Sequence, residues 1–140
     1  MPRYVASRTL PAPVGEVWAV LSEPQRFADW WPGLERVDPT VRRGFAPGAL
    51  WQIEGTDRPS FRLRPQLSGT LLVLEVVTER RLVFQLIHAH VDVELDLEAV
   101  PDGETAATLS VEAPRLSGVG RAFPSEVLAR LADLVRPTAS

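Results

Sequence analysis

Two histidines are the residues of this sequence with the widest chemical range. His88 and His90 are its only histidines, and their i, i+2 spacing places them on one face of a continuous strand. With Asp92 beside them, such a pair would be typical of a metal site. However, Ala89 and His90 fall where a turn is expected, and the acids that follow alternate with apolar residues as on a solvated strand face. We therefore expect neither a metal nor a cofactor.

His88 remains the best candidate for catalysis. It continues the alternation of Leu82, Phe84 and Leu86, which we expect on the inner face of a sheet. An imidazole in that position could hold a ligand by a hydrogen bond or move a proton near neutral pH. The alternative is a histidine at the end of a strand, half in water. The sequence leaves both interpretations open.

Other catalytic arrangements find little support. The chain has no Cys and no Lys, which excludes disulfides, a cysteine nucleophile and a Schiff base on a side chain. Asp29, Glu54 and Asp57 lie nearest the expected mouth of a pocket, but no pair of them has a spacing that fixes a two-carboxylate mechanism. The segment Ser117–Gly120 lacks the surroundings of a nucleophilic serine and the lysine of a phosphate-binding loop. Any catalysis must rest on His88, carboxylates, hydroxyls or the shape of a cavity.

Length and composition bound the class of protein. The chain has 140 residues, of which 45% are hydrophobic and 24% charged, as in one globular domain, and we expect that domain to span residues 1–140. A net charge of −3 argues against a protein that binds nucleic acid. No apolar stretch approaches the roughly 20 residues that cross a membrane, and the N-terminus has no apolar signal core. These features predict a cytoplasmic protein without membrane insertion.

Hydrophobic periodicity predicts the elements that must position these residues. Val14, Val17, Trp18 and Leu21 follow helical spacing, and a second short helix is expected over Gln25–Trp30. Most of the remaining chain alternates with the period of a strand. Strands are expected over Tyr4–Leu10, residues 34–44, Ala49–Thr56, Thr70–Thr78, Leu82–His88, Val91–Val100 and Thr105–Ala113. A terminal helix carries Val127, Leu131 and Leu134 in one stripe.

This order of elements predicts an α+β fold with an internal space. There is no alternation of strand and helix, so we do not expect a parallel nucleotide-binding sheet. One terminal helix of roughly 20 residues cannot cover a flat sheet of seven strands, which exceeds about 30 Å in width. A curved antiparallel sheet wrapped around that helix is the remaining solution. Such an arrangement leaves room for a lined pocket between sheet and helix.

Two segments of the sequence resemble those of a known superfamily. These are Pro13–Leu21 (PVGEVWAVL) and Phe27–Gly33 (FADWWPG), followed by Arg80–Leu82 and Pro101–Thr105 before later strands. The chain is similar to the SRPBCC superfamily of START-like, helix-grip proteins, and within it to the polyketide cyclase/dehydrase and lipid-transport group. The resemblance implies a curved seven-stranded antiparallel sheet around a long C-terminal helix, with two short helices between the first two strands. Pro124 departs from the pattern, because it either kinks that helix or starts it.

The residues expected to line the cavity are mostly apolar and aromatic. Trp51 shares the apolar face of its strand with Ile53, and one of Trp30 and Trp31 is expected to face the cavity while the other packs the short helix onto the sheet. On the terminal helix, residues toward Phe123 should line the cavity. The full expected set is Trp31, Trp51, Ile53, Phe61, Leu72, Leu74, Phe84, Leu86, His88, Val93, Leu95, Leu109, Phe123 and Val127.

Three functions follow from these features. The first is binding of a small hydrophobic or amphipathic molecule, such as a lipid or an aromatic polyketide, in the cavity. The second is a polyketide cyclase, aromatase or dehydratase, in which the cavity would fold the substrate and His88 would move a proton. The third is a protein-interaction module with a collapsed cavity and an exposed apolar patch. Because no second titratable group inside the pocket is apparent, binding ranks above catalysis. The sequence leaves open whether the protein is a monomer or a homodimer.

Overall fold

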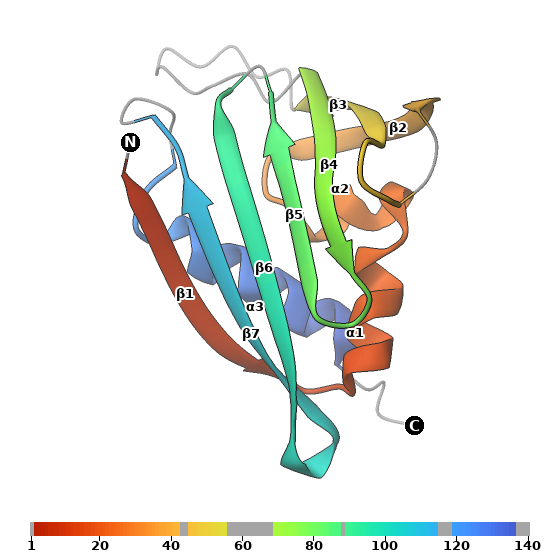
Figure 1. Cartoon of the computed structure of the whole chain (residues 1–140). Helices are drawn as coiled ribbons and strands as arrows, with labels where there is room; N and C mark the ends of the chain where they lie inside the picture. Colours follow the sequence, from red (N-terminus) through yellow and green to blue (C-terminus); the bar gives the residue numbers. More distant parts are fainter. Residues whose placement is uncertain (1, 43–44, 56–68, 88, 115–118, 137–140) are drawn as a thin grey trace.

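The computed structural model describes residues 2–42, 45–55, 69–87, 89–114 and 119–136. Its elements follow the expected order, with antiparallel strands between two groups of helices (Figure 1). They are β1 (Arg3–Leu10), α1 (Val14–Leu21), η1 (Pro24–Arg26), α2 (Phe27–Trp30), β2 (Leu34–Arg42), β3 (Leu50–Gly55), β4 (Gly69–Val77), β5 (Arg81–Leu86), β6 (Val91–Val100), η2 (Pro101–Gly103), β7 (Glu104–Glu112) and α3 (Phe123–Val135).

The seven strands form one antiparallel sheet in the order β1-β7-β6-β5-β4-β3-β2. The first strand thus pairs with the last, while β2 to β7 follow one another as hairpins. The helix α3 crosses one face of the sheet, and α1 and α2 lie beside it on that same face (Figure 1). This is the helix-grip fold, so the predicted fold class is confirmed.

Alternation decides which face of each strand is buried. In β6, Val91, Val93, Leu95 and Leu97 are buried, while the acids between them are only partly covered. Leu82, Phe84 and Leu86 of β5 are buried in the same way, and so are Trp51 and Ile53 of β3. These inner faces agree with the sequence pattern, because one side of an antiparallel sheet packs against the helices and the other meets water.

The strand β4 buries the opposite face from the one that the sequence analysis expected. Leu71 and Val73 are buried, whereas Leu72 is only partly covered and Leu74 is 44% exposed on the outer face. Every position from Leu71 to Leu74 is apolar, so the sequence offers no alternation by which to choose a face. Pairing chooses it instead, since Val73 lies opposite the buried Phe84. The expectation that Leu72 and Leu74 line a cavity was wrong.

The terminal helix is shorter than expected and begins at Phe123, with Pro124 in its first turn. Proline suits that position because its missing N–H would have no partner within the helix. Pro124 therefore starts α3 and does not kink it. The helix has 13 residues and buries Val127, Leu128, Leu131 and Val135 against the sheet. Leu134, which the stripe placed in the core, is only partly buried.

Candidate ligand-binding site

Aromatic side chains gather inside the molecule, between the sheet and the helices. We name this group the aromatic cluster, and it consists of Phe27, Trp30, Trp31, Trp51, Phe84 and Phe123. It draws on α2 and the residue after it, on β3, on β5 and on the first turn of α3. Five of its six members are at most 2% exposed, and Phe123 is partly buried. The cluster is therefore the meeting point of four elements that are distant in sequence.

Helical spacing places the first three rings together. Phe27, Trp30 and Trp31 stand at i, i+3 and i+4, which is the spacing of one helix face. Phe27 and Trp30 belong to α2, which follows η1, and Trp31 comes directly after its last residue. The ring centroids of Phe27 and Trp30 are 4.7 Å apart, and those of Phe27 and Trp31 are 5.6 Å apart. The short helix α2 and the residue after it therefore bring three rings to the interior.

The sheet and α3 close around these rings. Phe84 of β5 lies 5.4 Å from Phe27 and 5.5 Å from Trp31, measured between ring centroids. Phe123 lies 5.1 Å from Trp31, so the start of α3 contacts the cluster directly. Most of these pairs meet edge to face, while Phe27 and Trp31 are stacked at an interplanar angle of 15°. Both arrangements are favourable for aromatic rings.

Two polar atoms in this cluster lack a hydrogen-bond partner in the part of the chain that the structure describes. The indole nitrogens of Trp30 and Trp31 are buried and have no hydrogen-bond acceptor among the described residues. Both tryptophans are only 1% exposed. A buried donor without a partner costs about 1–3 kcal/mol, and buried polar groups are nearly always paired with protein or ordered water. Two such donors in neighbouring residues make the aromatic cluster a candidate site for a ligand that accepts hydrogen bonds.

The surroundings of these two donors carry no charge. Among the described residues, the buried side chains are apolar except for Thr105. The hydroxyl of Thr105 donates a hydrogen bond to the carbonyl oxygen of Ala12 at 2.8 Å, so it is occupied. The described residues also contain no group of His, Asp and Glu that could hold a metal ion. In the described part of the chain, the buried interior is apolar and has no acid or base.

The structure brings together some of the predicted lining residues and separates others. Trp31, Trp51, Phe84 and Phe123 meet in the aromatic cluster. Other predicted residues are buried on the inner face of the sheet or on α3, namely Ile53, Leu86, Val93, Leu95, Leu109 and Val127. Phe61 and His88 lie outside the described residues. His90 is exposed and has a φ of 55° in the turn before β6, where it faces no buried site.

The expected set of residues missed Phe27 and Trp30. Both are 2% exposed or less and belong to the cluster. The sequence expectation had one of Trp30 and Trp31 face the cavity and the other pack the short helix onto the sheet, and both are buried. The i, i+3, i+4 spacing of Phe27, Trp30 and Trp31 is the sequence signal that could have predicted both. The short helix was instead expected to begin at Gln25, and the spacing was not counted from Phe27.

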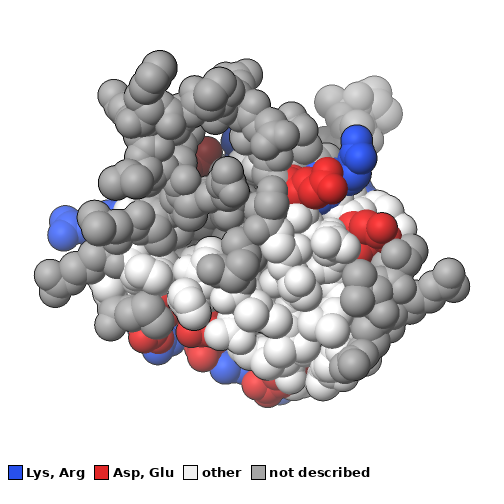
Figure 2. Space-filling model, turned by 90° about the horizontal axis from the view of Figure 1, so that it is seen from above, with Lys and Arg blue, Asp and Glu red and all other residues white. Residues whose placement is uncertain are grey.

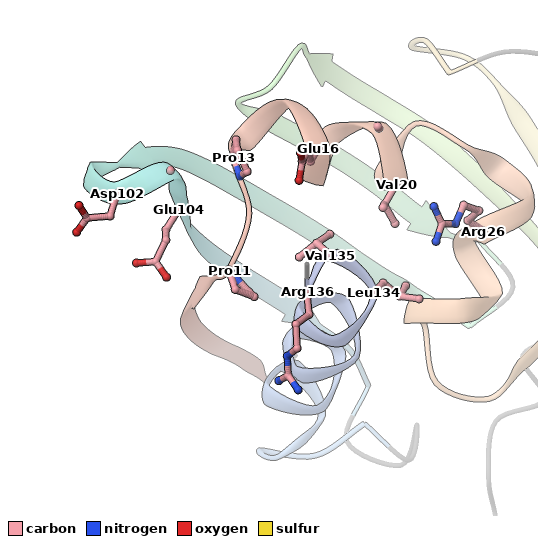
Figure 3. A pocket seen from close by; sticks show the side chains of 12 residues that line it. Pro11, Pro13, Glu16, Val20, Arg26, Asp102, Glu104, Leu134, Val135 and Arg136 are labelled. Carbon is pink, nitrogen blue, oxygen red and sulfur yellow. The ribbon is translucent and has the colours of Figure 1, made fainter. Parts of the chain in front are cut away.

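A pocket of about 910 Å³ opens on the surface, away from the aromatic cluster. It lies between α1, the end of α3 and the hairpin that joins β6 to β7 (Figure 3). Asp102 and Glu104 line it from the hairpin and Glu16 from α1, while Arg26 and Arg136 line it at two separate places (Figure 3). Arg26 lies 3.9 Å from Asp29 of α2, and Arg136 lies 3.3 Å from Asp133 of α3. Its charged wall sets this pocket apart from the apolar interior.

Comparisons with solved structures show the same fold. NE0264 from Nitrosomonas europaea superposes with a TM-score of 0.71 at 19% identity, over 96% of this chain and 94% of its own. Ara h 8.0201 superposes with a TM-score of 0.64 at 12% identity, over 96% of this chain and 97% of its own. DynU16, a protein in the dynemicin biosynthetic locus, superposes with a TM-score of 0.61 at 22% identity, over 94% of this chain and 46% of its own. At such identities these likenesses show the fold alone.

A comparison with curated proteins finds no significant match. In the described part of the chain, no helix is both long and apolar enough to cross a membrane. The model of one family does match, and that family is described as polyketide cyclase/dehydrase and lipid transport. The match runs over residues 1–136 and so includes every described element of the helix-grip fold. The chain therefore belongs to the polyketide cyclase/dehydrase and lipid transport family.

Proposed function

We propose that the protein binds a small hydrophobic or amphipathic molecule between the sheet and α3, at the aromatic cluster. The observation that carries this proposal is the pair of buried indole N–H groups of Trp30 and Trp31, which have no acceptor among the described residues. In a core that binds no ligand, two unpaired donors would only lower the stability of the fold. A ligand that seats against the rings supplies both apolar contact and a partner for a donor.

Apolar burial supplies most of the affinity in this proposal. Each Å² of apolar surface removed from water contributes about 25 cal/mol, and the cluster offers flat rings on which an aromatic or alicyclic molecule can lie. Viewed from the upper end of Figure 1, uncharged residues form much of the described surface (Figure 2). Charged side chains of the described residues are visible in this view at the upper right and along the lower edge (Figure 2).

Two further hypotheses have less support. A cyclase or dehydratase needs a group that moves protons, and no ionisable side chain of the described residues is buried. His88, the predicted catalyst, lies outside the described residues, so its catalytic role stays a prediction. The cytoplasmic location also stays a prediction. An interaction module needs a continuous apolar patch. Among the described residues, the exposed large apolar side chains are Val5 on β1, Leu74 and Val77 on β4, and Ile87 after β5, so at least two strands separate Val5 from the others.

The experiment that tests binding combines ligand detection with a variant of the cluster. We expect native mass spectrometry and thermal unfolding to reveal at least one bound compound in a panel of lipids, flat aromatic ketones and aromatic hydrocarbons. Trp31→Leu removes a buried ring that contacts both Phe84 and Phe123, so it should weaken binding at least ten-fold, about 1.4 kcal/mol. Val5→Ser, on the outer face, is the matched control and should leave affinity unchanged. If no compound binds, the proposal is wrong.

A further inference from the structure

The two unpaired indoles carry information about the ligand itself. An indole N–H can donate a hydrogen bond but cannot accept one. The other side chains of the aromatic cluster are phenylalanines and Trp51, none of which presents an oxygen. The cluster thus combines two donors without a partner and no side-chain acceptor. A ligand that matches this polarity brings acceptors and no donors.

We propose that the ligand is a flat, uncharged molecule with a hydrogen-bond acceptor of the ketone or quinone type, and that Trp30 and Trp31 select it by donating to that oxygen. This inference rests on the proposed function and adds the polarity that the bound molecule must have. It assigns the two tryptophans a role in specificity besides their contribution of apolar surface.

The absence of buried charge in the described interior explains why the ligand is neutral. A carboxylate taken out of water needs a positive partner to offset its loss of hydration. The arginines whose burial the structure describes are all at least partly exposed, and Arg81 and Arg3 are bound to acids on the outer face of the sheet. An anionic ligand at the cluster would therefore lie without a counter-charge from the described residues. An ester of the same molecule avoids this cost.

The arrangement of the rings explains why the ligand is flat. Phe27 and Trp31 are stacked, while Trp30 and Phe84 meet them edge to face. A planar aromatic molecule can lie against the face of one ring and meet the edge of the next, as these side chains already do with one another. The carbonyl oxygen in the plane of such a molecule is then available to an indole N–H from the side.

A matched pair of probes isolates the acceptor. Fluorenone and fluorene share one planar skeleton and differ by the carbonyl oxygen. We expect isothermal titration calorimetry to show that wild-type protein binds fluorenone at least about ten-fold more tightly, since one well-placed hydrogen bond to an otherwise unpaired donor is worth that much. Without such a bond the hydrocarbon, which is less well hydrated, should bind at least as tightly as the ketone.

Variants then assign the preference to the indoles. Trp30→Phe and Trp31→Phe each keep a ring and remove one N–H, so at least one of them should abolish the preference, and the double variant must do so. Phe84→Leu is the matched control, because it removes a ring from the same cluster without removing a donor. It should weaken both probes by a similar factor and leave their affinity ratio unchanged. Circular dichroism and the urea midpoint of each variant show whether it is folded.

The outcomes separate the two proposals. If neither probe binds and no other compound does, the proposed function fails. If both bind with an affinity ratio that the double Trp→Phe variant leaves unchanged, this inference is overturned, because water or ring faces then satisfy the indoles, while the proposed function stands. Where the variants do not fold, the wild type is titrated with fluorenone-4-carboxylic acid and its methyl ester at pH 7. Tighter binding of the ester supports the inference, and equal or tighter binding of the acid overturns it.

Discussion

At the scale of single residues, the buried polar side-chain atoms of the described residues fall into two groups, those with a hydrogen-bond partner and those without one. The hydroxyl of Thr105 has a partner, since it donates to the carbonyl oxygen of Ala12 at 2.8 Å and so ties the start of β7 to the segment between β1 and α1. The indole nitrogens of Trp30 and Trp31 have none among the described residues. The hydrogen bond of Thr105 thus stabilises the fold, whereas the two indole N–H groups form no hydrogen bond with the described residues that would stabilise it.

Replacement of Thr105 by valine tests the structural half of this contrast. Thr105→Val keeps the size and shape of the side chain but leaves the carbonyl oxygen of Ala12 without this donor. We expect the free energy of unfolding to fall by about 1–3 kcal/mol, measured by urea denaturation. Thr105→Ser retains the hydroxyl and should lose less than Thr105→Val. Equal stability of Thr105→Val and the wild type would show that the bond contributes nothing.

At the scale of elements, alternation predicted most of the sheet but could not orient β4. In β6 and β7 polar and apolar residues alternate, and the inner face follows directly. In β4 the run Leu71 to Leu74 is apolar throughout, and the pairing with β5 shifts between Val73 and Glu75. A shift of register sends side chains to a different face, and only the partner strand determines where it falls. The error at Leu72 and Leu74 therefore reflects information that lies outside β4 itself.

The hairpin between β6 and β7 depends on one glycine. Gly103 has a φ of +71°, and an added Cβ there would meet nothing within 4 Å. Any loss of stability in Gly103→Ala therefore comes from the backbone, and we expect about 1 kcal/mol by thermal or urea unfolding. Gly120→Ala is the matched control, because a Cβ there also meets open space and no positive φ is required. A loss of similar size in both variants would contradict this account.

The outer face of the sheet is held by an ion-pair network centred on Arg81 of β5. Its guanidinium contacts Asp96 at 2.8 Å, Glu75 at 3.2 Å and Glu94 at 3.5 Å, and thereby links β4, β5 and β6. The hydrogen bond to Asp96, followed by that to Glu75, raises the pKa of Arg81 above its ordinary value. A raised pKa means that the arginine contributes its stabilisation at all pH values below the ordinary one, so salt and not alkali is the practical way to weaken it.

We expect Arg81→Met to lower the free energy of unfolding by about 1 kcal/mol at low salt, since exposed ion pairs contribute little individually and more in a network. In about 1 M NaCl, where charges are screened beyond roughly 3 Å, the difference from the wild type should shrink. Arg130→Met removes a single i, i+4 pair with Glu126 on α3 and should cost less. The measurement is urea unfolding at both salt concentrations, and a loss that salt does not change would rule out an electrostatic cause.

At the scale of the whole molecule, the fold was predictable and the site was only partly so. The order of elements and the need to cover a wide sheet with few helices led to the helix-grip arrangement, which the structure confirms. Trp51 and Phe84 were predicted to face inward from their own strands. That they meet Trp31 and Phe123 depends on how α2 and α3 dock on the curved sheet, and no local pattern encodes that docking. The unpaired state of the indoles is visible only after this docking.

A ligand bound at the junction of α2, β3, β5 and α3 should stabilise all of these elements together, because each contributes a ring to the aromatic cluster. At a fluorenone concentration about 100 times its Kd, linkage predicts a gain of about 2.7 kcal/mol in the free energy of unfolding. The urea midpoint followed by far-ultraviolet circular dichroism should rise while the slope m stays the same, since the protein surface exposed on unfolding is little changed. Trp18→Phe alters an indole of α1 outside the cluster and should show the same gain. A ligand that binds but leaves the midpoint unmoved would have no preference for the folded state, and the cluster would not be its site.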